Sequence, residues 1–178
     1  MVLETERLVL RPWEESDAES LYEYAKNPEV GSPAGWQAHG SVEESLFVIK
    51  NFFCGAQCYA ICEKETGRAI GAIELKLQDN SEEAKGEDEC ELGYWIGKPF
   101  WGKGYVPEAG KKLLEYAFET LGMNTVWCCF YEGNVKSQRV AEKLGFVHHH
   151  SRGEVDVPLL GERRVEIAWW MTKEMWGE

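Results

Sequence analysis

A glycine-containing segment in the middle of the chain has the residue types that could bind a phosphate. Gly97, Gly102 and Gly104 lie between a predicted strand and a predicted amphipathic helix that starts at Val106. Glycine allows the backbone to approach an anion closely, and the first N–H groups of a helix have no partners within that helix. The helix dipole adds partial positive charge at the same end. The segment therefore predicts an anion-binding loop, with a plain strand-to-helix turn as the alternative.

Two common phosphate-binding patterns do not fit this segment. The dinucleotide pattern needs a third glycine where the chain has Pro107. The P-loop pattern needs a serine or threonine after its lysine, but Gly104 follows Lys103. Pro107 suits a first helical turn, where its missing N–H costs nothing. The patterns disfavour a nucleotide-binding protein of the kinase or dehydrogenase type.

Three short motifs, taken in their order along the chain, resemble the GNAT acetyltransferases. They are Trp101-Gly102-Lys103-Gly104-Tyr105-x-x-Glu108-Ala109, then Asn134-x-x-Ser137, and then Lys143-Leu144-Gly145-Phe146. The opening residues 3–11 and the aromatic last strand resemble the RimJ/RimL branch of this family in particular. The resemblance covers nearly the whole chain, and the ordered combination is specific although no single motif is.

The resemblance implies that the chain binds acetyl-coenzyme A and needs no metal. In this family the pantetheine arm lies along the strand before the loop, and the diphosphate rests on backbone N–H groups of the loop. The residues that correspond to a cofactor site are Tyr94, Trp95, Ile96, Trp101, Gly102, Lys103, Gly104, Tyr105, Val106, Asn134, Ser137 and Arg139. Lys103, Lys136 and Arg139 are the cations best placed for the phosphates, although Lys136 and Arg139 also fit as ordinary surface charges.

Transfer of an acetyl group to an amine needs a neutral amine and a proton for the leaving thiolate. Many GNAT proteins supply that proton from a tyrosine, where this chain has Val140 and Ala141. The resemblance to the RimJ/RimL branch implies Ser137 as the acid instead. The alternative is that Ser137 only hydrogen-bonds the first turn of its helix. No nucleophilic cysteine is required.

The general base has several candidates. Glu91 corresponds roughly to the position where some GNAT relatives carry theirs. Glu74 lies in an apolar Ala-Ile-Glu-Leu run, and burial there would raise its pKa towards a value useful for a base. On alternate pleats Glu74 would instead face solvent. Asp156, Glu154 or a water chain are the other possibilities.

The acceptor is expected to be a primary amine, such as a peptide N-terminus, a polyamine or another small amine. Its binding wall is expected from residues 28–40 and 152–162, with Trp36 and Asp156 as the named contacts. The net charge of −12 fits a cationic or amine substrate and excludes general binding to nucleic acid or to acidic membranes. Much of this charge lies between Asp79 and Glu91, which predicts either a solvated loop or a segment that steers amines.

Cysteine and histidine do not indicate a metal site. The six cysteines lack a second ligand pair at a suitable spacing and are expected to be reduced thiols. In a regular strand His148 and His150 would share one face while His149 took the other, which three-ligand zinc would not tolerate. The N-terminus lacks a signal-peptide pattern and no apolar run could span a bilayer, so a cytoplasmic protein is expected.

The elements that must position these residues are predicted as one mixed α/β domain over residues 1–178. Strands are expected at residues 7–11, 58–63, 69–77, 90–96, 125–130, from residue 146, and at 163–171. Helices are expected from the Ser16–Glu19 capping box to about residue 26, from the Ser41–Glu44 capping box to residue 53, and at 106–121 and 136–144, with loops at 30–40 and 152–161.

The resemblance implies the GNAT fold: a central mixed, largely antiparallel twisted sheet of about seven strands, splayed between strands 4 and 5 and flanked by about four helices. Exposed tryptophans, expected among the eight in the chain, together with the habit of the family predict a homodimer. The expected activity is direct acetyl transfer from acetyl-coenzyme A to an amine in a ternary complex. A coenzyme A-binding regulatory module with weak or no catalysis is the alternative.

Overall fold

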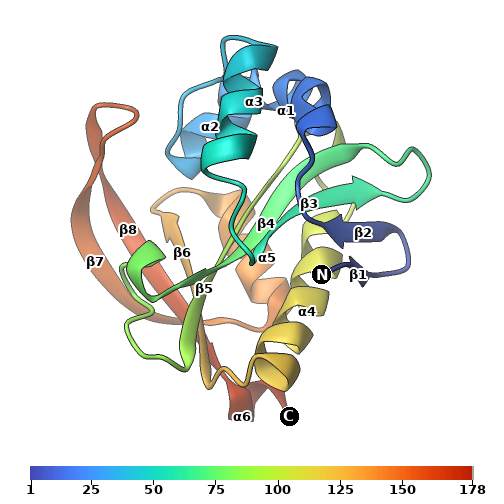
Figure 1. Cartoon of the computed structure of the whole chain (residues 1–178). Coiled ribbons are helices and arrows are strands. Elements are labelled where there is room, and N and C mark those ends of the chain that lie inside the picture. The colour runs from blue at the N-terminus through green and yellow to red at the C-terminus, as the bar shows by residue number, and fades with distance from the viewer. Residues whose placement is uncertain (178) are drawn as a thin grey trace. The chain divides into compact units, whose positions relative to one another are not determined.

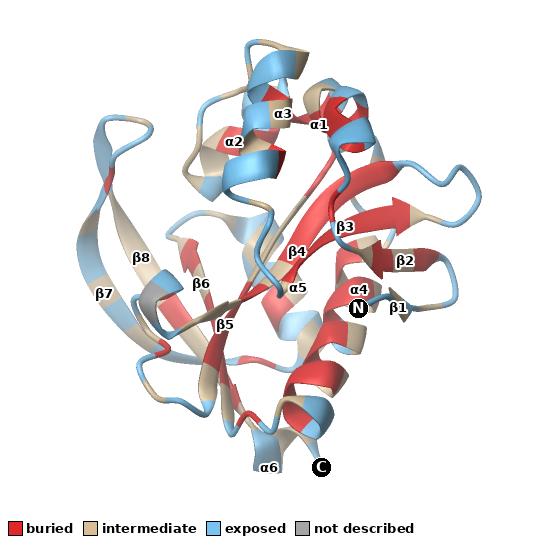
Figure 2. Cartoon of the chain, in the orientation of Figure 1, coloured by how far each residue is buried: buried red, intermediate tan, exposed pale blue. Residues whose placement is uncertain are grey.

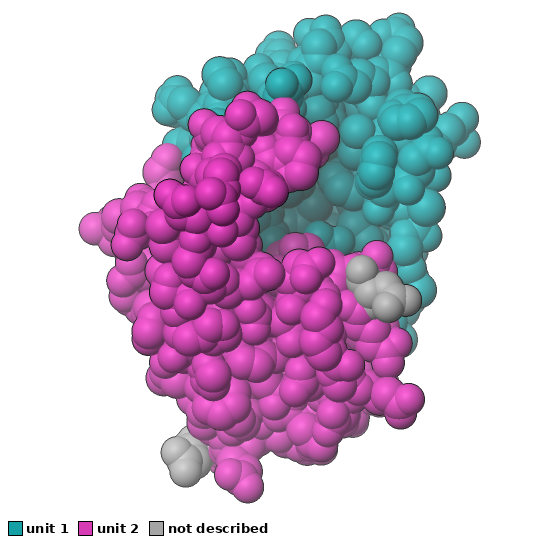
Figure 3. Space-filling view, turned by 90° about the vertical axis from the view of Figure 1, so that its left-hand side faces the viewer, with its two compact units in different colours: residues 1–74, 94–109 teal, residues 75–93, 110–178 magenta. Residues whose placement is uncertain are grey.

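The structure is a computed structural model that describes residues 1–177, apart from the side chain of Asp79. The chain forms two compact units, which Figure 3 colours separately. Unit 1 comprises Met1–Glu74 and Tyr94–Ala109, and unit 2 comprises Leu75–Gly93 and Gly110–Glu178. Two strands and one helix of the chain cross from one unit into the other.

The strands of the described chain form one eight-stranded sheet in the order β1-β2-β3-β4-β5-β6-β8-β7 (Figure 1). They are β1 (Leu3–Glu4), β2 (Leu8–Arg11), β3 (Cys58–Glu63), β4 (Ala69–Leu77), β5 (Glu89–Ile96), β6 (Thr125–Tyr131), β7 (Val147–Val157) and β8 (Glu162–Thr172). The pairs β1–β2, β2–β3, β3–β4, β6–β8 and β7–β8 are antiparallel, whereas β5–β6 is parallel. The predicted mixed, largely antiparallel sheet is confirmed, with the short β1 as an additional strand.

The parallel pair of β5 and β6 is short. The register joins Glu89–Glu91 to Thr125–Trp127, which is three residues of each strand. β5 continues to Ile96 and β6 continues to Tyr131. The longer antiparallel partner of β6 is β8, whose register extends from Thr172 to Glu166.

Unit 1 buries an apolar core between its helices and its strands. α1 (Ala18–Ala25) and α3 (Val42–Asn51) contribute Leu21 and Ile49 to a cluster with small residues of β3 and β4. β3 and β4 are buried along most of their length (Figure 2). Burying a leucine or isoleucine side chain contributes roughly 1.5–3 kcal/mol, so this face holds the helices to the sheet.

Of the two predicted capping boxes, the one at Ser41 is present only as an N-cap, because the Glu44 carboxylate accepts from the Gly40 N–H and not from that of Ser41. The Ser41 hydroxyl accepts a hydrogen bond from the Glu44 N–H at 3.1 Å, so α3 starts as predicted. The prediction for Ser16 is wrong, because a short 3₁₀ turn, η1 (Glu15–Asp17), precedes α1. There the Asp17 carboxylate accepts from the Glu14 N–H at 2.9 Å and pairs with Arg11, which fixes that turn.

The predicted loop at residues 30–40 contains a helix, so this prediction is wrong. α2 spans Pro28–Ala34, and the Asn27 side chain caps it by accepting from the Glu29 N–H at 3.0 Å. Pro28 occupies the first turn, where a proline is tolerated. Gly35, at a φ of 89°, ends the helix.

The helix α4 (Tyr105–Glu115) begins in unit 1 and continues into unit 2 from Gly110. Unit 2 also contains a π-helical turn, η4 (Tyr116–Thr120), and the helices α5 (Val135–Leu144) and α6 (Lys173–Trp176). The sequence predicted one continuous helix to residue 121 and did not indicate α6. Gly110 lets the two longer helices approach closely, because a Cβ there would lie 2.8 Å from a Leu144 methyl carbon. Gly145, at a φ of 91°, ends α5 as predicted.

The predicted loop at residues 152–161 is mostly strand, so this prediction is also wrong. β7 continues to Val157 and pairs with β8 in a long hairpin. Register shifts lie between His148 and His150 and between Ser151 and Gly153. Because of the first shift, His149 and His150 contact the same ring, that of Trp127, so the expected strict alternation of the histidines is wrong.

The tryptophans do not provide the exposed surface that the homodimer prediction used. Each of the eight is buried or half-buried, so the expectation of exposed tryptophans is wrong. The exposed large apolar side chains among the described residues include Phe47 and Phe52. Within the described residues, no helix has the length and apolar character required to cross a membrane.

Candidate active site

The loop after β5 is held at its start by one hydrogen bond to β4 and one to the last residue of β5. The Gly97 N–H donates to the Ile70 carbonyl at 2.8 Å, and the Trp101 indole N–H donates to the Ile96 carbonyl at 2.9 Å. Between them lies a 3₁₀ turn, η3 (Lys98–Phe100). The loop therefore leaves the sheet in one defined direction.

The glycines of the loop have the backbone conformations expected of an anion site. Gly102 and Gly104 have φ angles of 75° and 79°, in the left-handed region that favours glycine. In the described part of the chain, no acceptor is found for the backbone N–H groups of Gly102, Lys103 and Gly104. These donors lie directly before the first turn of α4, where the helix dipole favours an anion.

Two further contacts shape the loop. The Lys103 ammonium lies 5.2 Å from the centre of the Phe100 ring. The Tyr105 hydroxyl donates to Glu63 at 2.8 Å, and this hydrogen bond raises the pKa of Tyr105. The first residue of α4 is thereby tied to the end of β3.

Glu108, in the first turn of α4, is bound to the N-terminal arm of unit 1. Its carboxylate accepts from the Thr5 hydroxyl at 2.5 Å, the Arg7 N–H at 2.9 Å and the Arg7 Nε at 2.6 Å. Partial burial alone would raise the pKa of Glu108, but the hydrogen bonds from Thr5 and Arg7 outweigh burial and lower it. Glu108 is thus held as a carboxylate.

The last residues of β5 pack against β4 and against Trp36. A Cβ at Gly71 would lie 2.4 Å from the Trp95 carbonyl oxygen and 2.9 Å from Ile96 Cα, so only glycine allows this strand approach. The Trp36 and Trp95 rings meet edge to face with centres 5.6 Å apart. Trp36 therefore lies beside the strand predicted to hold the pantetheine arm, while Tyr94 is half-buried.

Asn134, rather than Ser137, caps α5 in unit 2. The Asn134 Oδ1 accepts from the Ser137 backbone N–H at 3.2 Å. Ser137 is half-buried, and Lys136 and Arg139 are exposed on the same helix. The serine side chain is therefore not needed for this cap, although its backbone N–H is.

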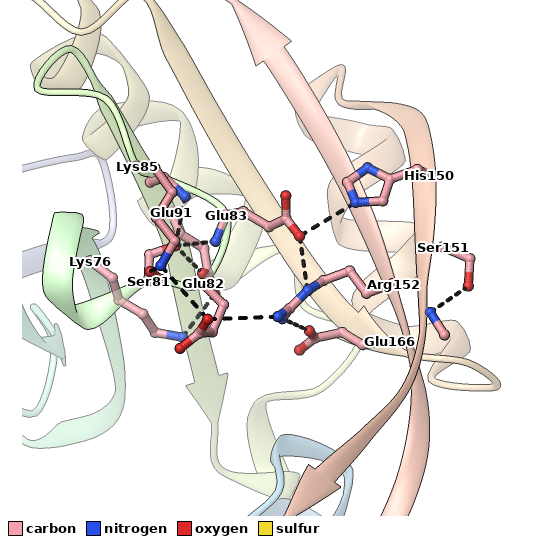
Figure 4. Close-up of polar contacts among 12 residues, drawn as sticks. Lys76, Ser81, Glu82, Glu83, Lys85, Glu91, His150, Ser151, Arg152 and Glu166 are labelled. Carbon is pink, nitrogen blue, oxygen red and sulfur yellow. Dashed lines mark hydrogen bonds and ion pairs between the residues drawn. The ribbon is translucent and has the colours of Figure 1, made fainter.

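Glu91 lies in a polar cluster on the unit 2 part of the sheet (Figure 4). Only 7% of the residue is exposed. Its Oε1 accepts from the Lys76 ammonium at 2.9 Å and its Oε2 accepts from the Ser81 hydroxyl at 2.7 Å. Both oxygens of this predicted base thus have a donor.

A second group of charges surrounds Arg152 of β7 (Figure 4). Its guanidinium pairs with Glu83 at 2.9 Å and with Glu166 of β8. Burial raises the pKa of Glu166, although Arg152 opposes this effect. Glu83 is also 3.4 Å from the His150 Nε2. Together these contacts tie the hairpin to the segment before β5.

The acidic segment is therefore only partly a solvated loop. Ser81 and Ala84 are buried, and the Glu83 side chain is 13% exposed. The Ser81 hydroxyl accepts from the N–H groups of Glu83 and Ala84, which turns the chain back towards the sheet. The side chain of Asp79 lies outside the described residues.

The other acidic candidates are less enclosed. Glu74 is half-buried and its Cα pairs with Cys58 in the β3–β4 register. The Asp156 side chain is 82% exposed and lies 3.3 Å from Arg163 of the facing strand. Of the candidate site residues, Trp36, Glu74, Tyr94–Ile96 and Trp101–Val106 belong to unit 1, and Glu91, Asn134, Ser137, Arg139 and Asp156 belong to unit 2.

The cysteines are free thiols, and most of them are buried. Burial raises the pKa of Cys90 to about 12 and that of Cys62 to about 11, which leaves little thiolate for nucleophilic attack. Burial also raises the pKa of Cys129. Over the residues that the structure describes, no cluster of three or more His, Cys, Asp or Glu side chains could hold a metal ion.

Sequence reasoning did not single out the partners that hold the acidic candidates. Lys76, Arg152 and Glu166 were not among the predicted site residues. One sequence signal was available for Glu166: like Glu74, it is a carboxylate among apolar strand residues, in the run Arg-Val-Glu-Ile-Ala. The bulged register of β7, which brings Arg152 to Glu83 and Glu166, has no comparable sequence signal.

Comparison with known proteins identifies the family. Residues 7–147 match the sequence model of the acetyltransferase (GNAT) domain. "Uncharacterized N-acetyltransferase p20" of Bacillus licheniformis is 30% identical over 149 residues, which are 81% of each chain. "Putative ribosomal N-acetyltransferase YdaF" of Bacillus subtilis (strain 168) is 49% identical over 59 residues, which are 33% of this chain and 32% of that protein.

Solved structures agree on the fold. A GNAT-family acetyltransferase from Bacillus anthracis superposes with a TM-score of 0.84 at 22% identity, covering 98% of this chain and 99% of the other. A structure from Vibrio cholerae titled as a "putative ribosomal-protein-serine acetyltransferase" superposes with a TM-score of 0.79 at 22% identity, covering 97% of each chain. With the family match extending over most of its length, the chain belongs to the GNAT family of N-acetyltransferases.

Proposed function

We propose that this GNAT protein transfers the acetyl group of acetyl-coenzyme A directly to a primary amine, in a ternary complex with both substrates. The observation that carries the proposal is the loop before α4. Three consecutive backbone N–H groups, those of Gly102 to Gly104, have no acceptor within the described residues. Two positive-φ glycines and a helix N-terminus accompany them. This donor set fits a diphosphate.

Coenzyme A, when bound, supplies an activated acetyl thioester. We propose that Trp101 to Val106 hold its diphosphate through backbone N–H groups, with Lys103 and Arg139 as cations. Tyr94, Trp95 and Ile96 would bind the pantetheine arm as a neighbouring strand would, through backbone hydrogen bonds. Asn134 and Ser137 complete the proposed set. The positive φ values of Gly102 and Gly104 are common to plain turns and to anion-binding loops, so the three backbone N–H groups without an acceptor carry the argument.

The chain offers an acid and two bases for the chemistry. We propose that the Ser137 hydroxyl protonates the departing thiolate, in keeping with the resemblance to the RimJ/RimL branch; the Asn134 cap uses the backbone N–H of Ser137. Glu91 is the first candidate to take the proton of the amine, since it is buried. Lys76 and Ser81 occupy its oxygens, so Glu91 would act through a shift of one of these donors or through a water. Glu74 is the second candidate.

We propose a protein N-terminus as the acceptor, in keeping with the RimJ/RimL branch. The Bacillus subtilis relative is named a "putative ribosomal N-acetyltransferase", and the Vibrio cholerae protein is named a "putative ribosomal-protein-serine acetyltransferase". Trp36 and Asp156 are proposed to contact the acceptor. A polyamine or another small amine remains the second class of acceptor, because the net charge of −12 favours any cationic substrate.

Thiol release from acetyl-coenzyme A, measured with a panel of peptides and small amines, tests this function. The expected result is thiol release that depends on one class of amine, with mass spectrometry detecting one added acetyl group on that amine. A matched reaction without enzyme provides the background rate. Tight coenzyme A binding without thiol release from any amine would contradict the proposal and favour a coenzyme A-binding module.

A further inference from the structure

The strongest feature outside the residues assigned above is the contact between the N-terminal arm and α4. Arg7 makes two bonds to one oxygen of Glu108, from Nε and Nη2, each 2.6 Å long. The second oxygen of Glu108 accepts from the Arg7 N–H and the Thr5 hydroxyl. These four donors fix the Glu108 carboxylate and the Arg7 side chain relative to each other.

The same guanidinium reaches the anion-binding loop. The Arg7 Nη1 donates to the Lys103 carbonyl at 3.0 Å. The described peptide bonds contain no cis bond, and in a trans peptide the C=O and the following N–H point in opposite directions. By holding the Lys103 carbonyl, Arg7 therefore directs the Gly104 N–H to the opposite side of that peptide.

The Arg7 side chain is also fixed in position by an aromatic ring. Its guanidinium carbon lies 4.4 Å from the centre of the Tyr105 ring. Tyr105 is in turn hydrogen-bonded to Glu63 of β3. A planar guanidinium held by a ring, a carboxylate and a carbonyl loses little further freedom when a ligand binds, so its geometry is set in advance.

The charges of Arg7 and Glu108 give a second reason why these two side chains pair beside the loop. A carboxylate in the first turn of α4 interacts favourably with the helix dipole, but it would repel a diphosphate at the same helix end. The Arg7 guanidinium balances the Glu108 charge at 2.6 Å. Glu108 can therefore anchor the arm without opposing an anion on the loop.

We propose that Arg7, anchored by Glu108, is a positioning residue that orients the Gly104 N–H towards the diphosphate of coenzyme A. The inference rests on the proposed function, because it needs the loop to bind that diphosphate. It adds a role for the N-terminal arm, which lies about a hundred residues before the loop in the chain. Arg7 acts through the loop backbone and contacts no reacting atom.

Binding of three ligands by calorimetry tests the role of Arg7. Coenzyme A and its 3′-dephospho form carry the diphosphate, and pantetheine lacks it. For Arg7→Gln and Arg7→Lys we expect the Kd of the two diphosphate ligands to rise by about 10- to 100-fold, the range of a lost hydrogen bond involving a charged group. The Kd of pantetheine should change by less than about twofold. Lys50→Gln, which removes an exposed cation paired with Glu15 in the same unit, is the matched control and should bind all three normally.

An exchange of charges separates positioning from stability. The double variant Arg7→Glu with Glu108→Arg can re-form the ion pair, but a glutamate cannot donate to the Lys103 carbonyl. We expect it to recover part of the Tm lost in either single variant while coenzyme A binding stays weak. Recovery of coenzyme A binding together with the Tm would show that only the ion pair matters and would overturn the proposal.

The single variants keep the test decisive even if the double variant does not fold. Wild-type preference for coenzyme A over pantetheine in Arg7→Gln, which lacks the guanidinium and its charge, would refute the role of Arg7 and leave the proposed function intact. Equal weakening of pantetheine would assign Arg7 to stability alone. If the loss affected coenzyme A but not its dephospho form, Arg7 would act on the 3′-phosphate and the inference would be wrong. A wild-type protein with no preference for the diphosphate ligands would overturn the proposed loop assignment as well.

Discussion

Ser137 and Asn134 have separable roles at the residue scale, because the hydrogen bond between them uses a backbone donor of one and a side-chain acceptor of the other. The Asn134 Oδ1 accepts from the Ser137 N–H. Replacing Ser137 by alanine removes the hydroxyl and keeps this cap. Replacing Asn134 by alanine removes the cap and keeps the hydroxyl.

We therefore expect Ser137→Ala to lower kcat by about 100-fold, the lower part of the range for a lost general acid. Its Tm should stay close to that of the wild type. Asn134→Ala should lose about 1 kcal/mol of unfolding free energy, as for other helix caps. Steady-state kinetics and urea unfolding of both variants measure the two effects. An unchanged kcat in Ser137→Ala would remove the serine from the proposed mechanism.

At the scale of elements, two carboxylates with pKa values shifted in opposite directions connect strands and helices. Burial raises the pKa of Glu166, which joins β8 to Arg152 of β7. Hydrogen bonds from Thr5 and Arg7 outweigh burial and lower the pKa of Glu108, which joins α4 to the arm. The ordinary value for both is 4.5. A raised pKa means stability that is present below pH 4.5 and lost as the pH rises, and a lowered pKa means the reverse.

Glutamine variants of Glu166 and Glu108 should change the pH dependence of the unfolding free energy in opposite directions. Relative to wild type, Glu166→Gln should gain unfolding free energy as the pH rises above 4.5, because glutamine has no charge to desolvate. Relative to wild type, Glu108→Gln should gain as the pH falls below 4.5, where the wild type loses its paired carboxylate. Urea unfolding across this range measures both differences. A pH-independent difference for either variant would contradict the shift assigned to that residue.

The elements that were predicted correctly are those whose sequence patterns depend only on residues close together in the chain. The Ser41 cap, the glycine at the end of α5 and the apolar pattern of the central strands each depend on a few neighbouring residues, and the structure contains all three. α2 was missed because its glycine and prolines are typical of loops, while the cap at Asn27 and the proline in its first turn compensate. The length of β7 was missed because its pairing with β8 decides it, and a bulged register has no local pattern.

The site was predictable to a similar degree. Trp101 to Val106 were named because the resemblance to the GNAT family adds to the glycines and the following helix, and their role in cofactor binding stays a prediction. The donors on Glu91 could not be named, because Lys76 and Ser81 reach it across a strand pair and a turn. The same holds for Arg7 and Glu108, whose contact links residues about a hundred positions apart.

For the whole molecule, the net charge of −12 should influence how substrates arrive. A negative protein attracts cationic acceptors over distances set by the Debye length, which falls from about 30 Å at 0.01 M salt to about 8 Å at 0.15 M. We expect kcat/KM for a basic acceptor peptide to fall several-fold over this range. An acidic peptide with the same N-terminus is the control and should show no fall. Equal salt dependence of the two peptides would exclude steering.

The homodimer and the single domain over residues 1–178 stay predictions at this scale. Because every tryptophan is at least partly buried, the argument from exposed tryptophans no longer supports a dimer. The exposed pair Phe47 and Phe52, with ring centres 6.1 Å apart, is one apolar surface feature among the described residues of unit 1.

The π-helical turn after α4 shows how a helix can accommodate one extra residue. Tyr116, Ala117 and Phe118 are consecutive and all buried, which a regular α-helix with its apolar stripe on one side does not readily achieve. The wider turn, in which the Leu121 N–H bonds to the Tyr116 carbonyl at 3.0 Å, contains one residue more than an α-helical turn. Such a turn is equivalent to a one-residue insertion that the helix has absorbed. Phe118, which lies within this turn, stacks on Trp176 of α6, with ring centres 5.7 Å apart.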